Sequence, residues 1–127
     1  MKKQLFSLAL VMLPWATGLA ATELGGIYYN LNIDEGTASV TVSPDGYSGD
    51  IVIPETVKED KVTYQVTSIE REAFANCTDV TTVVIGDNVV DIGFQAFKGC
   101  SGLTTVTIGT GVRNIAWRRF GLATVTA

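Results

Sequence analysis

The chain has 127 residues, which is the size of a single domain. Thirteen Asp and Glu outnumber nine Lys and Arg, and this acidic balance argues against binding to nucleic acid or anionic lipid, since both require basic patches. The absence of histidine excludes histidine-activated nucleophiles and histidine metal sites, and two cysteines are too few for a disulfide scaffold.

Residues 1–21 have the three-part pattern of a secretory signal peptide. Two lysines precede an apolar run from Leu5 to Leu13, and small residues follow it. A membrane anchor is the alternative, but the run is shorter than the roughly 20 apolar residues that span a bilayer. We therefore expect cleavage after Ala20 or Ala21, export of the mature chain, and no insertion of that chain into a membrane.

Residues 22–49 are predicted to form an N-terminal β cap. They contain two strand-like runs, IYYNLNI and ASVTVSPDGY, separated by the turn residues Asp34-Glu35-Gly36. Residues 50–127 predict a stack of repeating coils, as shown below, and the first coil of such a stack needs a covered end.

Residues 50–57 (DIVIPETV) resemble the later segments VVIGDNV and VTIGTGV, so the first coil begins here. Compared with the later coils, the sequence that follows has about nine extra residues, KEDKVTYQV. We interpret these residues as an inserted hairpin whose turn lies in Lys58-Glu59-Asp60-Lys61.

The peptide Ala-Phe-x-x-Cys occurs twice, 23 residues apart, within a longer repeat. When 66–86 is aligned with 89–109, almost every matched position is apolar or glycine, and the unmatched positions are mostly polar. Such a fixed period predicts a β-rich solenoid in which stacked coils share one core. The predicted core repeat positions are Ile69, Ala73, Phe74, Cys77, Val83, Ile85, Ile92, Ala96, Phe97, Cys100, Val106 and Ile108.

Each coil is expected to contain one short strand, near residues 51–53, 83–85 and 106–108. Because side chains alternate along a strand, the neighbours of the core residues point outward. Glycines after the strands permit the turn, and the return segments EREAFANC and FQAFKGC are expected to form a single helical turn. The outward residues are the candidate binding surface: Thr82, Val84, Thr105 and Thr107.

The motif V-T-x-I-x-x-x-A-F-x-x-C-x-x-V/L-x-x-V-x-I, with the lead-in IYYNLN…YSGDIVIPETV…VTYQVTSI, resembles the BspA-like (Treponema-type) leucine-rich repeat of bacterial surface proteins. The resemblance covers about residues 24–120. It implies a curved solenoid with a strand-lined concave face and export to the surface of host-associated bacteria. It also implies adhesion to host or bacterial surface proteins.

Stacking places the two cysteines, Cys77 and Cys100, about 4.8 Å apart in neighbouring coils. Parallel Cβ vectors suit a disulfide poorly, so a buried ladder of free thiols is favoured over a bridge, although export permits either. The phenylalanines at Phe74, Phe97 and Phe120 are interpreted in the same way, as a core ladder.

We predict no cofactor and no metal. The segment 109–114 (GTGVRN) matches part of a dinucleotide-binding loop but lacks the third glycine and the later acidic residue. Asp87 and Asp91 could form the carboxylate pair of a secreted glycan hydrolase. The matching coil has Thr110 and Asn114 at these positions, so solvated turn residues are favoured.

From residue 116 the pattern becomes irregular, with Arg119 where the repeat has alanine and Ala123 where it has cysteine. This suggests a truncated member of a longer protein, whose incomplete last coil can self-associate. The predicted function is a non-enzymatic, exported interaction or adhesion protein that binds host or bacterial surface proteins. The alternatives are a structural spacer and, less favoured, the hydrolase.

Overall fold

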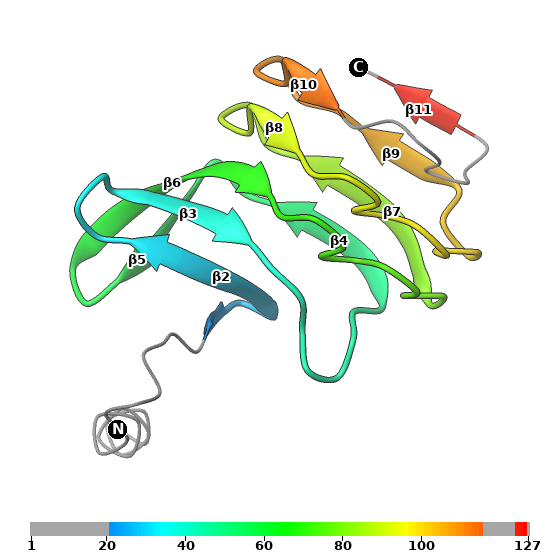
Figure 1. Ribbon diagram of the computed structural model, residues 1–127, viewed down its shortest axis with the longest axis horizontal. Coiled ribbons are helices and arrows are strands. Elements are labelled where there is room, and N and C mark those ends of the chain that lie inside the picture. Colours follow the sequence, from blue (N-terminus) through cyan, green and yellow to red (C-terminus); the bar gives the residue numbers. More distant parts are fainter. Residues whose placement is uncertain (1–20, 116–123, 127) are drawn as a thin grey trace.

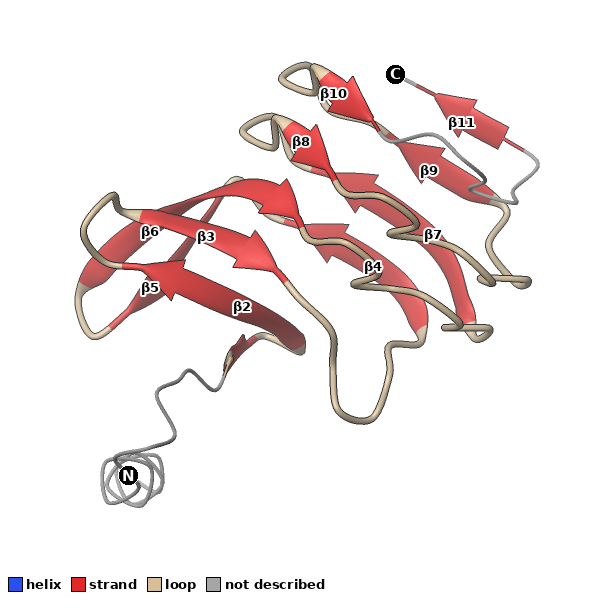
Figure 2. Ribbon diagram, viewed as in Figure 1, coloured by secondary structure: helices blue, strands red, loops and turns tan. Residues whose placement is uncertain are grey.

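The computed structural model describes residues 21–115 and 124–126, and in these residues it contains strands and turns but no helix (Figures 1 and 2). Consequently, no apolar helix of membrane-spanning length occurs in this part of the chain. The strands are β1 (Thr22–Leu24), β2 (Ile27–Asn32), β3 (Thr37–Val40), β4 (Gly49–Ile53), β5 (Thr56–Glu59), β6 (Val62–Ile69), β7 (Val80–Ile85), β8 (Asp91–Ile92), β9 (Thr105–Thr107), β10 (Asn114–Ile115) and β11 (Thr124–Thr126).

These strands form two sheets. One sheet has the order β11-β9-β7-β4, and its strands are parallel. The other has the order β1-β2-β3-β6-β8-β10, with β5 paired to β6. Figure 1 shows the coils stacked from β2 and β3 at one end to β10 and β11 at the other. This arrangement is the β-rich solenoid that the repeat predicted.

The first sheet contains one strand more than the sequence predicted. The strands expected near residues 51–53, 83–85 and 106–108 correspond to β4, β7 and β9, but β11 also pairs with β9. Paired residues are 23 positions apart between Thr82 and Thr105, but only 19 between Thr105 and Thr124. The shorter step moved β11 out of the expected register. The residues expected to be irregular, 116–123, lie outside the described residues.

The short parallel strands β8 and β10 were not predicted. Ile69, Ile92 and Ile115 are in register across β6, β8 and β10. A strand of two residues is too short to show the alternation that identifies a strand in a sequence, although the first two isoleucines were assigned to the core.

Both predicted hairpins are present. β2 and β3 pair antiparallel, and β3 then pairs in parallel with β6, so this hairpin extends the second sheet. β5 and β6 form the inserted hairpin, which turns at Asp60 and Lys61, both with positive φ. This places the turn within the predicted Lys58–Lys61 segment.

The return segments are successive tight turns, so the predicted helical turn is wrong. In the first of them Ala73 N donates to Glu70 O and Cys77 N donates to Phe74 O, each at 3.1 Å. Glu72 has a φ of 58°, which a right-handed helix does not permit. The amide of Phe74 is also used between coils, because it donates to Ala96 O at 2.8 Å.

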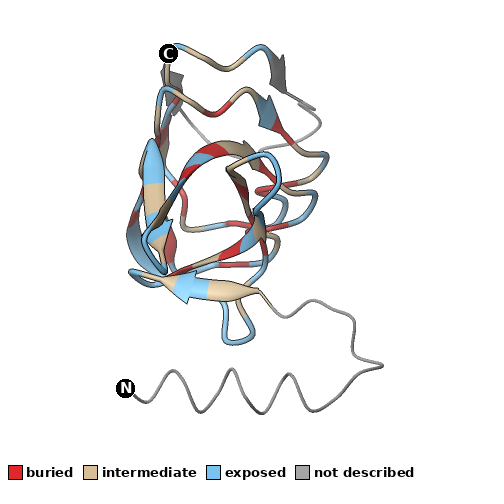
Figure 3. Cartoon of the chain, turned by 90° about the vertical axis from the view of Figure 1, so that its left-hand side faces the viewer, coloured by how far each residue is buried: buried red, intermediate tan, exposed pale blue. Residues whose placement is uncertain are grey.

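All twelve predicted core residues are buried, and seen end-on the buried segments line the inside of the stack (Figure 3). The rings of Phe74 and Phe97 stack with centroids 5.1 Å apart, as the ladder predicted. Tyr47 extends this ladder, with its ring centroid 4.4 Å from that of Phe74. The third predicted member, Phe120, lies outside the described residues.

The two cysteines are free and buried, which confirms the thiol ladder over a disulfide. Cys100 Sγ lies 2.9 Å from Phe74 O in the preceding coil, so the thiol donates a hydrogen bond there. The ladder therefore helps to join neighbouring coils.

The glycines after β7 and β9 have a different role from the predicted one. Neither Gly86 nor Gly109 has a positive φ, so neither is required for its backbone conformation. A Cβ on Gly86 would lie 2.8 Å from Ile53 O, and one on Gly109 would lie 2.6 Å from Ile85 O. Glycine is needed here because the coils approach each other closely.

Candidate functional site

The four residues predicted as a binding surface are neighbours on the outer side of the first sheet. Thr82 and Val84 come from β7, and their register partners on β9 are Thr105 and Thr107. Val84 and Thr107 are exposed, while the two other threonines are half-buried. The alternation of strand side chains that buries Val83 also directs its two neighbours outward.

β4 adds two residues that the sequence analysis missed. Asp50 is in register with Thr82, and Val52 with Val84. Val52 is 61% exposed and Val84 is 41% exposed, so two valine side chains lie side by side on the surface. The alignment of DIVIPETV with the later coils contained this signal, since matching Ile53 with Ile85 also matches the two valines. We call the set Asp50, Val52, Thr82, Val84, Thr105 and Thr107 the strand face.

The strand face carries a charge, whereas the sequence analysis expected it to be uncharged. Asp50 Oδ1 accepts hydrogen bonds from the hydroxyls of Thr81 and Thr82, both at 2.9 Å. Two donors on the same oxygen fix the orientation of the carboxylate. One row across the strands is therefore polar and acidic at its β4 end, and the next row begins with two valines.

Asp87 and Asp91, the residues of the hydrolase alternative, belong to different parts of the coil. Asp87 follows β7 of the first sheet, and Asp91 lies on β8 of the second sheet. Asp87 Oδ1 accepts a hydrogen bond from Thr110 N at 2.9 Å, so this carboxylate supports the turn of the next coil. Its position is explained by coil stacking, and it gives the hydrolase alternative no support.

Burial raises the pKa of Tyr29 and Tyr47 to about 12 and that of Cys100 to about 11. All three residues lie in the core, so these shifts reflect packing and do not identify a reactive site. Within residues 21–115 and 124–126 there is no group of three or more Cys, Asp and Glu side chains placed to hold a metal ion.

Comparison with known proteins identifies the family. The pattern described as "BspA type Leucine rich repeat region (6 copies)" matches residues 51–125, which is more than half of the chain. The chain belongs to this family. The BspA-like resemblance in the sequence is thereby confirmed. A search of curated proteins found no match.

Solved structures agree with this assignment. A leucine rich cell surface protein from Faecalibacterium prausnitzii is 32% identical to this BspA-type chain with a TM-score of 0.64, over 79% of this chain and 27% of that protein. A leucine-rich repeat protein from Bacteroides capillosus is 28% identical with a TM-score of 0.67, over 76% of this chain and 71% of that one.

A Treponema pallidum leucine rich repeat protein is 26% identical with a TM-score of 0.61, over 76% of this chain and 42% of that one. The match thus spans about a quarter of the Faecalibacterium protein and less than half of the Treponema protein.

Proposed function

We propose that this chain is an exported, non-enzymatic protein, secreted or located at the bacterial surface, that adheres to host or bacterial surface proteins through its strand face. The observation that carries the proposal is the pair Val52 and Val84, two exposed valines in direct register on one sheet. The other large exposed hydrophobic residues of the described part are Ile33, Val42 and Phe94, and they lie on separate segments. Isolated apolar residues are ordinary on a surface, whereas adjacent ones on a rigid sheet favour recognition.

The relatives support the proposed location and role. The Faecalibacterium protein is described as a cell surface protein, and the first 21 residues of this chain have the pattern of a signal peptide. A face of four strands offers few contacts, so each copy binds weakly, and repeated coils or clustered copies multiply the contacts.

The first test introduces charge at the centre of the strand face. In the double variant Thr82→Lys with Thr105→Lys, two ammonium groups lie beside the valine pair. We expect the labelled variant to lose most of its binding to epithelial cells and to co-resident bacteria, measured by flow cytometry. The matched control is Thr63→Lys with Gln65→Lys, which adds the same charges at exposed positions of β6. If both double variants bind like the unmodified chain, the assignment of the strand face is wrong.

Export is tested separately, by expressing the full chain in a Bacteroides host and measuring the mass of the exported product. Cleavage after Ala20 or Ala21 supports the proposal, and retention of the intact chain inside the cell contradicts it. A stable, exported chain that binds no cell under any condition would favour the spacer alternative.

Self-association through the C-terminal coil is a further part of this proposal. β11 stands at the end of the strand order β11-β9-β7-β4, and such an end presents backbone groups that a second copy can pair with. Light scattering after gel filtration is expected to show a mass above that of one chain that rises with concentration. A constant monomer mass contradicts the prediction.

A further inference from the structure

The charged residues around the strand face all have the same sign. The segments that contain β4, β7 and β9 are residues 49–56, 79–88 and 102–111, and they contain four acidic residues and no Lys or Arg. The acidic residues are Asp50, Glu55, Asp79 and Asp87. All Lys and Arg in the described part of the chain lie on other segments, and they are Lys58, Lys61, Arg71, Lys98 and Arg113.

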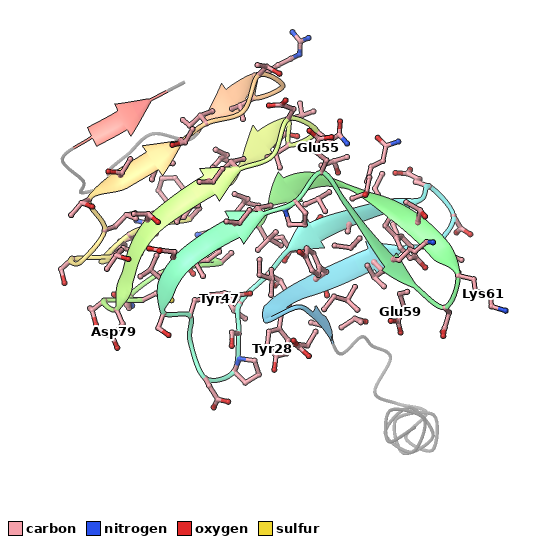
Figure 4. All side chains as sticks on the ribbon, turned by 180° about the vertical axis from the view of Figure 1, so that it is seen from behind. Tyr28, Tyr47, Glu55, Glu59, Lys61 and Asp79 are labelled. Atoms are coloured by element: carbon pink, nitrogen blue, oxygen red, sulfur yellow. The ribbon has the colours of Figure 1, made fainter. Side chains whose placement is uncertain are left out.

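The carboxylates border the valine pair at both ends of the strands. Asp79 directly precedes β7, and Glu55 follows β4 (Figure 4). Figure 4 also shows Lys61 on the β5–β6 hairpin, away from the outer side of this sheet. Because attraction between opposite charges guides association and repulsion between like charges excludes wrong partners, this distribution favours a cationic partner.

Asp50 is the carboxylate best placed to bind a cation. The hydroxyls of Thr81 and Thr82 both donate to its Oδ1, and among the described residues its Oδ2 has no hydrogen-bond partner. The carboxylate is therefore held in one orientation while one oxygen stays available. A side chain fixed in this way loses little conformational freedom when it binds.

The spacing of the face defines the partner further. Asp50 and Val52 are two residues apart on one strand, which is about 6.6–6.8 Å along an extended chain. Val52 and Val84 lie on adjacent strands, about 4.8 Å apart. An extended partner with the same two-residue interval can place a cation at Asp50 and one aliphatic side chain on both valines.

We propose that the strand face binds an extended basic segment of another protein, in which Lys or Arg stands two residues from an aliphatic side chain. The cationic group pairs with Asp50, and the aliphatic side chain covers Val52 and Val84. This inference rests on the proposed function and names the chemistry of the partner for the same face.

The test uses the full chain, labelled with ¹⁵N, and three short synthetic peptides in a serine background. The first peptide has lysine and valine two residues apart, the second has glutamate in place of lysine, and the third has lysine and valine adjacent. We expect the first peptide to shift the amide signals of β4 and β7 at millimolar concentration. The second is expected to cause no shifts, and the third at most weaker ones.

Asp50→Asn is the matched variant, because an asparagine oxygen still accepts hydrogen bonds from both threonine hydroxyls while the charge is lost. We expect it to weaken binding of the first peptide about two- to fivefold, as for a solvent-accessible ion pair. Raising the salt from 0.15 M to 1 M should weaken binding of the unmodified chain similarly, because the screening length falls from about 8 to about 3 Å. Asp34→Asn removes one charge from the exposed β2–β3 turn and should leave binding unchanged.

Equal binding of the lysine and glutamate peptides, or equal affinity of Asp50→Asn and the unmodified chain, would overturn the inference. If no peptide binds but the Thr82 and Thr105 lysine variant still loses cell binding, the inference fails and the proposed function survives. If the lysine variant also binds cells normally, both fail.

Discussion

Phe74 provides the most direct test of how the coils are held together. Its side chain has no exposed surface, and its ring lies between Tyr47 at 4.4 Å and Phe97 at 5.1 Å. Phe74→Leu keeps an apolar side chain of similar size but removes both aromatic pairs. Since one such pair contributes about 0.5–1.5 kcal/mol beyond burial, two pairs correspond to about 1–3 kcal/mol.

This loss is large compared with the about 5–15 kcal/mol by which a domain is stable, yet the variant should still fold. The assay is urea unfolding followed by far-ultraviolet circular dichroism. With a slope of about 1–3 kcal/mol per molar urea, the midpoint is expected to fall by roughly 1 M while the slope is unchanged.

Phe94→Leu is the matched control, because it makes the same substitution at a ring that is 40% exposed. Its recorded partner is the guanidinium of Arg71, 5.5 Å from the ring centroid, and this contact contributes about 0.5–1 kcal/mol. If Phe74→Leu loses no more free energy of unfolding than Phe94→Leu, the aromatic ladder does not stabilise the stack as argued here.

Three further predictions concern contacts between neighbouring segments. Gly109→Ala should lower the free energy of unfolding by about 1–3 kcal/mol in urea melts, because its Cβ would overlap backbone oxygens of the preceding coil. Tyr47→Phe removes a hydroxyl that donates to Thr41 O at 2.6 Å and accepts from Tyr28 N at 3.1 Å, so hydrogen exchange at the Tyr28 amide should accelerate about tenfold or more. Burial raises the pKa of Cys100 from 9.0 to about 11, so the unfolded chain loses this proton first, and stability that is complete below pH 9 is lost as the pH rises toward 11. Urea melts at pH 8 and pH 10.5 should show this loss, and Cys100→Ala should reduce it; an equal loss in that variant would refute the assignment.

The core and its repeat could be predicted because every buried slot recurs with the same chemistry. Phe74 and Phe97 are matched by spacing alone, and both are buried and stacked. Tyr47 was missed because it lies in the first coil, where a longer loop and a different residue type obscure the match. β11 was missed because its coil is shorter than the period used to search for it.

The outer surface was predicted less completely. Alternation along β7 and β9 correctly placed Thr82, Val84, Thr105 and Thr107 together. Asp50 was missed although it lies in the same row, because β4 was compared with later coils only at its buried positions. The hydrogen bonds that fix its carboxylate join residues more than 30 positions apart, and a sequence pattern does not contain that information.

The inserted β5–β6 hairpin has a consequence for how such chains vary. It separates Asp50 from its partner Thr82 by 32 positions, against 23 for the next pair, yet β4 still pairs with β7. Extra residues leave the stack at a corner between the sheets and return to it without disturbing the strands. In-frame insertions at these corners, and duplications of whole repeats, can therefore lengthen the gene while the buried ladders continue unchanged, so evolution can alter reach and surface decoration independently of the core.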